Sequence, residues 1–212
     1  MKKLNAFTLA EVLITLGVIG VIAAITMPSV VKKYQKISTV TKLKKVYTTL
    51  NQAIKLSEAE NGEYEYWEQI SDIGEDAYFN KYWKPYLKSA KICNTYQACG
   101  YKSNSPWVNL QGTNAQTPGV TYVGRLSLIL TDGAFVSIQT LSGGKIISTI
   151  YVDINAGNLP NKLGRDAFYF TRTNKGQVVA SEGNNCTPSG VGTSCAKKII
   201  EDGWQIMDDY PW

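Results

Sequence analysis

The side chains most able to do chemistry in this chain are four cysteines, one glutamate at the start of an apolar run, and a group of aspartates and asparagines. The sequence contains no histidine, which removes the commonest general base and the commonest metal ligand. It also lacks a Ser/His/Asp set, a phosphate-binding loop and a pair of carboxylates within an apolar segment. We therefore expect a protein without catalytic activity.

The cysteines predict two disulfides. An even number of cysteines suits an exported chain, and three pairings are open to Cys93, Cys99, Cys186 and Cys195. Pairing each cysteine with its nearest neighbour in the sequence is the simplest choice, since each such pair flanks polar, turn-rich sequence. Metal binding is the rival interpretation, which the absence of Cys-x-x-Cys spacing and of histidine disfavours. Reduced cysteines stay open as well if the compartment is not oxidising.

Oxygen-bearing side chains cluster between residues 153 and 166. Asp153, Asn155 and Asn158 lie on a glycine-containing turn, and Asp166 follows close behind. Carboxylate and amide oxygens alternating along a loop suit Ca²⁺, so these four residues are candidate calcium ligands. The spacing is not that of an EF-hand, and Asx/Gly runs also form ordinary turns. Both interpretations stay open.

The elements that position these groups begin with an apolar segment. Residues 12–31 carry no charge, and a helix of about twenty residues, at about 1.5 Å per residue, just crosses the hydrocarbon core of a bilayer. A secretory signal has its small residues after the apolar core. Here the small residue Ala6 comes first, at the end of a basic leader and directly before Phe7. Cleavage at this point would remove the leader and leave the apolar helix on the mature protein.

Glu11 stands at the start of the apolar segment. A carboxylate near the end of a membrane helix costs a few kcal/mol unless it is neutralised or paired. If Phe7 becomes the new N-terminus, its α-amine lies about one helical turn from Glu11, and the same amine on a neighbouring subunit would be a natural partner. The alternative is a carboxylate that sits among the lipid headgroups.

A basic leader, a small residue, Phe-Thr-Leu-x-Glu and a long apolar helix resemble, in this order, the class III signal of type IV pilins and type II secretion pseudopilins. The resemblance implies that a membrane-embedded prepilin peptidase cuts between Ala6 and Phe7 and N-methylates Phe7. It also implies that Glu11 acts in assembly. The chain departs from the family at Ala6, where most members have glycine, and at Ala10, where a bulkier aliphatic residue is usual.

The same resemblance extends along the apolar helix. Pro28 lies where family members carry a helix-bending proline, and Gly17 and Gly20 loosen the same stretch. We therefore expect a kinked helix. Small residues at Gly17, Gly20 and Ala24 would also permit close approach of neighbouring helices.

The resemblance implies a structural subunit that packs with itself and other pilins in a helical filament. Before assembly, the chain would cross the bacterial inner membrane once, with its C-terminal domain outside the cytoplasm, and a secretion or pilus assembly platform would extract it. Residues 153–168 and 202–212 resemble the C-terminal regions of pseudopilin-like proteins, which favours a type II secretion pseudopilus over a type IV pilus. The alternative is a minor pilin that takes up DNA or adheres to a surface.

The rest of the chain predicts an α+β, pilin-like fold. Apolar residues recur at helical spacing from Leu43 to Ile54, and Asn61-Gly62 supplies a helix stop. Residues 76–87 predict a short helix interrupted by Pro85, within an aromatic segment that we interpret as core, with a ligand-stacking surface as the alternative. Antiparallel strands are predicted at residues 124–131, 134–141, 145–154, 167–172 and 177–180, with a hairpin turn at Asp132-Gly133.

Four parts are thus expected: a leader at residues 1–6, a transmembrane and filament-core helix at 7–31, its amphipathic continuation at 32–61, and a globular domain at 62–212, in which the helix packs on the sheet. The formal net charge of +5 is too small to indicate nucleic acid as a partner. Lys42, Lys44 and Lys45, on the amphipathic helix, are the basic residues that a DNA-binding function would use.

Overall fold

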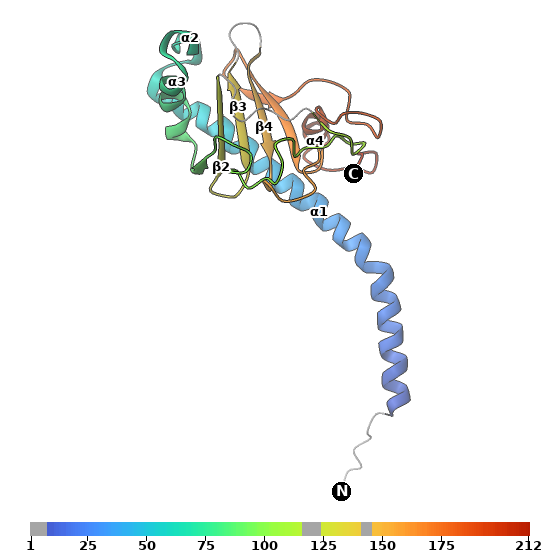
Figure 1. Cartoon of the computed structure of the whole chain (residues 1–212). Helices are drawn as coiled ribbons and strands as arrows, with labels where there is room; N and C mark the ends of the chain where they lie inside the picture. Colours follow the sequence, from blue (N-terminus) through green and yellow to red (C-terminus); the bar gives the residue numbers. More distant parts are fainter. Residues whose placement is uncertain (1–7, 116–123, 141–145) are drawn as a thin grey trace. The chain divides into compact units, whose positions relative to one another are not determined.

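The computed structural model describes residues 8–115, 124–140 and 146–212, and the chain divides into two compact units, residues 1–38 and 39–212. The predicted leader, the cleavage position between Ala6 and Phe7 and the methylation of Phe7 lie outside the described residues. The described part of the first unit is helical, whereas the second unit holds all the strands and the remaining helices (Figure 1).

Helix α1 runs from Leu9 to Asn61 and belongs to both units. It continues through Pro28, and its first buried residue is Thr39. The helix ends where the stop signal predicted, because Gly62 adopts a φ of 82°, a left-handed conformation that costs a glycine little.

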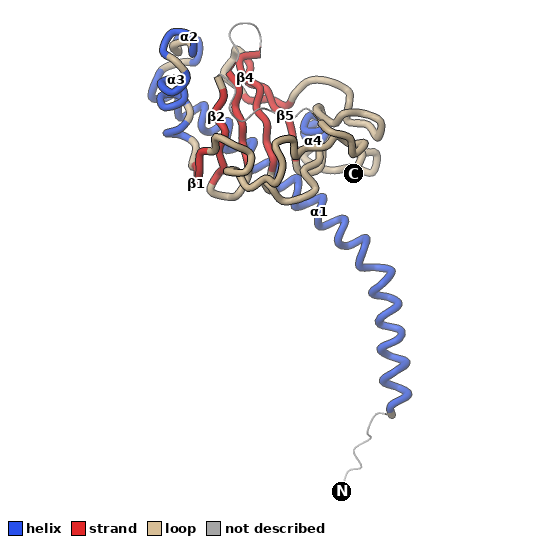
Figure 2. Tube along the Cα trace, in the orientation of Figure 1, coloured by secondary structure: helices blue, strands red, loops and turns tan. Residues whose placement is uncertain are grey.

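The second unit contains a six-stranded antiparallel sheet in which every strand pairs with the next one along the chain (Figure 2). The five predicted strands are confirmed as β2 to β6. The long N-terminal helix and the antiparallel sheet that follows it confirm the α+β layout. The Asp132-Gly133 turn joins β2 to β3 as expected, with Gly133 at a φ of 87°. The strands are β1 (Ser89–Ile92), β2 (Arg125–Leu130), β3 (Phe135–Thr140), β4 (Ile146–Asp153), β5 (Ala167–Thr173) and β6 (Val178–Ala180).

The part of α1 from Thr39 onward covers one face of this sheet (Figure 1). Because side chains alternate between the faces of a strand, every second strand residue points to the helix. The helix supplies the apolar residues that its periodicity predicted, among them Leu43, Leu50 and Ile54. The strand residues of this core are Leu126, Leu128, Leu130, Val136, Ile138, Ile150, Val152, Phe168, Phe170 and Val178.

The opposite face of the sheet has a core of its own, which the sequence did not predict. The intervening strand residues Phe135, Tyr151 and Tyr169 pack there against Trp107, whose side chain is buried. Ring centroids of these residues lie 6.1–6.3 Å from that of Trp107. Residues 93–115, from the segment between β1 and β2, therefore cover the second face of the sheet.

The aromatic segment after α1 forms α2 (Ile70–Ile73), α3 (Glu75–Tyr82) and two short 3₁₀ turns, Tyr64–Tyr66 and Lys84–Tyr86. The predicted helix at 76–87 therefore ends five residues early, because Pro85 cannot donate a helical hydrogen bond and its ring disfavours helical backbone before it. Trp67, Tyr78, Phe79, Tyr82 and Trp83 are buried, which confirms the core interpretation of this segment.

Several of these rings enclose Arg172 of β5, which is fully buried. Its guanidinium carbon lies 4.2 Å from the ring centroid of Tyr64, 5.0 Å from that of Trp67 and 5.4 Å from that of Trp83. Its Nη2 also donates to the Tyr78 hydroxyl at 3.3 Å. The rings thus stabilise a buried cation, and they join the segment after α1 to the sheet.

Two further elements were missed. Strand β1 has only four residues and no alternation that would distinguish it from a loop. Helix α4 (Cys195–Glu201) follows a glycine-rich, serine-rich stretch and has seven residues, too few for a clear helical period.

Candidate functional site

The apolar part of α1 exposes its large side chains on all sides. Leu13, Leu16 and Ile19 are 61–62% exposed, and burial of the helix begins only at Thr39. A helix that is apolar all round is found in a membrane or inside a larger assembly. Among the helices that the structure describes, α1 is the one long and apolar enough, by length and composition, to cross a membrane.

Glu11 and Thr8 cap the N-terminal end of this helix. The Thr8 hydroxyl accepts the Glu11 amide at 3.3 Å, and Glu11 Oε2 accepts both the Thr8 amide and the Thr8 hydroxyl at 2.8 Å. This reciprocal pair is a capping box, which satisfies helix N–H groups that have no backbone acceptor. All carboxylate bonds of the cap end on Oε2, so Oε1 lies outside it.

This capping role was missed, although Thr8-x-x-Glu11 is the sequence signal for it. It complements the predicted assembly role of Glu11, because a capped carboxylate is held in a fixed position at the helix start. Glu11 was expected either to pair with the amine of a neighbouring subunit or to lie among the lipid headgroups. The capping box adds a third interpretation, in which Glu11 stabilises the start of its own helix. Its contact with a neighbouring subunit stays a prediction.

The predicted kink residues lie within continuous helix. A Cβ placed on Gly17 or Gly20 would meet nothing within 4 Å, so their missing side chains open the helix surface to a neighbour rather than relieve a contact inside the chain. Near Pro28, the Thr26 hydroxyl donates to the Ile22 carbonyl at 2.9 Å. Threonine hydroxyls that bond to the carbonyl four residues earlier often bend a helix. The kink itself stays a prediction.

The predicted calcium ligands lie around one loop, but the two carboxylates among them already accept hydrogen bonds from other groups of the protein. Asp153 accepts the Tyr101 hydroxyl at 2.8 Å and the Asn155 amide at 3.1 Å. Asp166 accepts the amides of Asn161 at 2.9 Å and Lys162 at 2.6 Å. The aspartates therefore fold the chain around the end of β4.

The remaining predicted ligands add little to a cation site. Asn158 is exposed, and its side-chain amide donates to the Asn155 carbonyl at 2.8 Å. Asn155 Oδ1 is buried and has no donor among the residues that the structure describes. No group of three or more acidic, cysteine or histidine side chains in the described part of the chain is arranged to hold a metal. A calcium ion would have to compete with the hydrogen bonds of Asp153 and Asp166. Calcium binding stays a prediction that these bonds disfavour, and a thermal melt in millimolar Ca²⁺ tests it.

The buried carboxyl of Asp153 gives the domain a pH dependence. Burial, together with the nearby charge of Asp166, raises the Asp153 pKa well above its ordinary value of 3.8. Between about pH 4 and the raised pKa, the folded chain binds more protons than the unfolded chain, so the free energy of unfolding falls as the pH rises. Each unit of upward shift corresponds to about 1.4 kcal/mol.

We expect Asp153→Asn to flatten this dependence, because an amide carries no charge to bury. Denaturant unfolding of both chains at pH 4.5, 6 and 7.5 measures it. Burial also raises the pKa of Asp166, so part of the slope should persist in the variant. Equal slopes in the two chains would contradict the prediction.

The cysteines form two disulfides, between Cys93 and Cys99 and between Cys186 and Cys195, the local pairing that the sequence favoured. No cysteine is free, so the metal-binding alternative has no thiolate to use. The first disulfide closes a short loop within the buried cluster that also contains Trp107. The second joins the loop after β6 to Cys195, the first residue of α4, and such a cross-link lowers the conformational entropy of the unfolded chain.

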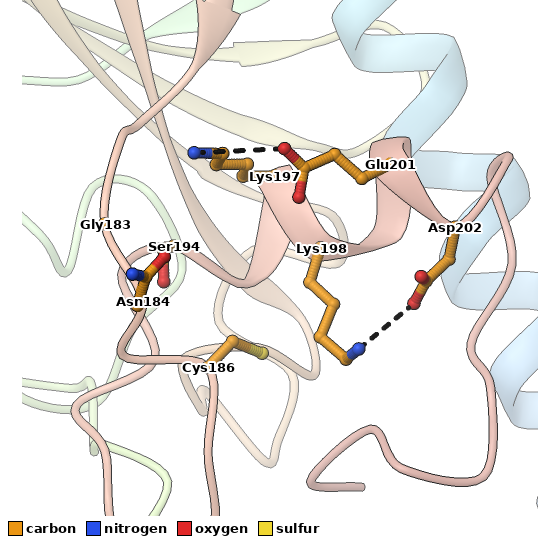
Figure 3. A pocket seen from close by; sticks show the side chains of 8 residues that line it. All are labelled: Gly183, Asn184, Cys186, Ser194, Lys197, Lys198, Glu201 and Asp202. Carbon is orange, nitrogen blue, oxygen red and sulfur yellow. Dashed lines mark ion pairs between the residues drawn. The ribbon is translucent and has the colours of Figure 1, made fainter.

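A cavity of about 190 Å³ lies beside α4, between that helix and the loop at Gly183 (Figure 3). Lys197 and Lys198 line it, and both are paired with carboxylates: Lys197 with Glu201 at 3.8 Å, and Lys198 with Asp202 at 3.4 Å (Figure 3). Its charges are therefore balanced within the protein. The apolar helix remains the strongest candidate functional site.

The fold and this helix place the protein in a general class: α+β domains whose long N-terminal helix begins with an exposed apolar segment. The chain belongs to a family of unknown function, DUF6613, whose model matches residues 29–183. The match starts directly after Pro28 and includes the rest of α1 and all six strands. No curated protein and no solved structure matches the chain.

Proposed function

We propose that this chain is a structural subunit of a bacterial filament, a type II secretion pseudopilus or a type IV pilus, and that the start of α1 anchors it in the inner membrane before assembly. The observation that carries the proposal is the exposed apolar helix with a single carboxylate at its start. The α+β domain and the two disulfides, which suit an exported chain, support it.

The apolar helix would have two successive environments. In the membrane, lipid covers side chains such as Leu13, Leu16 and Ile19, each of which gains roughly 1.5–3 kcal/mol from leaving water. In the filament, the same side chains pack against other copies, where the open surfaces at Gly17 and Gly20 permit close approach. Transfer between two apolar environments keeps them out of water throughout.

Glu11 would set the register of that packing. The capping box fixes its carboxylate at the helix start, and Oε1 remains for a partner outside the cap. The methylated α-amine of Phe7 on a neighbouring subunit would supply the opposite charge. In an apolar surrounding an unpaired carboxylate is costly, so register errors would be penalised strongly.

The resemblance of residues 153–168 and 202–212 to pseudopilin-like proteins favours the secretion filament. We do not advance the alternative of a DNA-uptake or adhesion pilin, because the rings that would stack on a ligand, including Trp67, Tyr82 and Trp83, are buried. The partners of the proposal are other pilins, the prepilin peptidase and the assembly platform in the inner membrane.

The proposal is tested by expressing the full chain in a bacterium with the prepilin peptidase and an assembly platform. Membranes and sheared surface material are then fractionated, and filaments are labelled with an antibody and viewed by electron microscopy. We expect the chain in membranes and in labelled filaments. A chain recovered entirely with soluble protein would overturn the proposal.

A further inference from the structure

Charge is strongly segregated along the chain. Residues 12–57 contain seven lysines and no acidic residue, whereas residues 58–76 contain eight acidic residues and no lysine or arginine. These eight account for nearly half of the 17 acidic residues of the chain. Like charges so concentrated in a folded domain repel one another, which a complementary partner would relieve.

The basic stretch borders a groove of about 680 Å³ between α1 and the segment that follows α4. We call it the α1–tail groove and define it by Lys44, Lys45, Thr48, Gln52 and Trp204. The Lys44 ammonium lies 5.6 Å from the ring centroid of Trp204. Positive charge, polar side chains and an aromatic wall therefore meet in one surface hollow of the second unit.

Trp204, the aromatic wall of the groove, is fixed by contacts with neighbouring residues. The Trp204 ring centroid lies 5.3 Å from that of Tyr47, and the Trp204 amide donates to the Ile199 carbonyl at 2.8 Å. Lys45 pairs with Asp132 at 3.0 Å. Lys44, by contrast, pairs with no carboxylate among the residues that the structure describes. The groove thus keeps net positive charge on a fixed frame.

The acidic stretch carries the matching surface. The turn Glu63–Tyr66, which we call the acidic turn, exposes the carboxylates of Glu63 and Glu65 and the ring of Tyr66, which is 76% exposed. The next residue fixes the turn: the Trp67 indole donates to the Gly62 carbonyl at 2.8 Å and stacks on Tyr82. Ordering such a turn in advance reduces the entropy cost of binding.

We propose that the acidic turn of one copy docks in the α1–tail groove of a second copy. Glu63 and Glu65 would meet Lys44 and its neighbours, and the Tyr66 ring would pack against Trp204, an aromatic anchor of the kind that dominates interface energies. The proposal rests on the proposed function, since it takes the partner to be another subunit, and it names the contact between them.

The occupant must come from another molecule. Within the second unit, Lys44 and the end of α1 at Asn61 are separated by about 25 Å of helix at 1.5 Å per residue. A copy's own turn, which Trp67 fixes to Gly62, therefore does not reach its own Lys44. Because the two surfaces differ, the contact is heterologous and repeats from copy to copy. Such a contact extends into an open filament where the rotation between copies does not close into a ring.

Other anionic occupants fit less well. Lipid headgroups would meet Lys32, Lys33 and Lys36 first, because these lysines follow the apolar run directly. Nucleic acid would be repelled by the eight acidic residues of the same domain. Neither occupant uses both the charge of Lys44 and the exposed ring of Tyr66.

Isotope-coded cross-linking of the full chain tests the contact. Unlabelled and ¹⁵N-labelled chains are mixed in phosphatidylcholine vesicles, and a zero-length carbodiimide joins lysines to carboxylates at low salt. We expect mixed-isotope peptides that join Lys42, Lys44 or Lys45 to Glu63 or Glu65. Their yield should fall at least fivefold at high salt, because salt screens exposed charges.

Charge exchange makes the test specific. Lys44→Glu alone or Glu65→Lys alone should lower the yield at least fivefold, and mixing the two variants should restore it through a new link between positions 44 and 65. Lys102→Glu, the same charge change at an exposed lysine outside both surfaces, should leave the yield unchanged. Circular dichroism and intact disulfides check that each variant folds.

Four outcomes would overturn the docking contact: links only within one copy, yields that Lys44→Glu does not change, a mixture that fails to restore linking, and links that vanish when phosphatidylglycerol or a DNA oligonucleotide is added. If filaments form and Phe7 is processed while these links are absent, only the contact fails. If the links form in a chain that is never processed, the contact stands and the proposed function fails.

Discussion

Glu11→Ala is expected to abolish filament assembly while cleavage before Phe7 continues. The variant loses both the cap on Thr8 and the charge that would pair with a neighbour. Leaving the neighbour's amine unpaired in an apolar core costs a few kcal/mol, and each 1.4 kcal/mol is a factor of ten in an association constant. Filament yield in the sheared fraction, normalised to membrane protein, measures the loss, which should exceed tenfold.

Two matched variants separate the cap from the charge. Glu11→Gln keeps an oxygen for the capping box but has no charge. Thr8→Ala removes the hydroxyl half of the cap and keeps both the carboxylate and its bond from the residue 8 backbone amide. We expect Glu11→Gln to fail in assembly as Glu11→Ala does, and Thr8→Ala to assemble. Normal filaments from Glu11→Gln would show that the carboxylate serves as a cap alone.

Leucine-to-alanine changes at two places in α1 should have opposite consequences. Leu50 is fully buried between the helix and the sheet, so Leu50→Ala is expected to lower the free energy of unfolding of the domain by about 2–5 kcal/mol. Leu16 is 61% exposed, and Leu16→Ala should change it by less than about 0.5 kcal/mol.

Denaturant unfolding of the full chain in a neutral detergent, followed by near-ultraviolet circular dichroism of the domain's aromatic rings, measures both changes. The two variants are each other's control, because the substitution and the helix are the same. Comparable losses at Leu16 and Leu50 would mean that the apolar segment is part of the domain's core, and would contradict its role as an anchor.

The sequence predicted those parts of the fold in which the spacing of apolar residues agrees with a stop or turn signal. The spacing from Leu43 to Ile54 predicted the buried face of α1, and Gly62 predicted its end, because only a residue tolerant of positive φ fits there readily. Asp132-Gly133 predicted the β2–β3 hairpin for the same physical reason. These signals are local, so a single sequence carries them.

Long-range features could not be predicted in this way. Trp107 lies in a segment without period, and its burial depends on contacts with β3, β4 and β5. Arg172 sits in a strand, where nothing in the sequence indicated that rings from residues 64–83 would surround it. In the sequence, the carboxylate of Asp153 suggested a cation site. In the structure, the hydroxyl of Tyr101, some fifty residues away, donates to one of its two oxygens.

The candidate site divides in the same way. Glu11 was predicted because a charge in an apolar run stands out, and its partner Thr8 was missed although the capping signal is local. The α1–tail groove could not be predicted, because Trp204 joins α1 only through the fold of the chain's end. The charge segregation between residues 12–57 and 58–76 is visible in the sequence. The docking contact that we propose could be inferred from it only after the structure showed the groove.

The most direct test of the account is the N-terminal mass of the protein purified from bacterial membranes that contain the prepilin peptidase. We predict a mature chain that begins at Phe7, carries one methyl group on its α-amine and retains the whole apolar helix. A membrane-bound chain that still begins at Met1, or a chain cut after the apolar segment and released as soluble protein, would contradict the account.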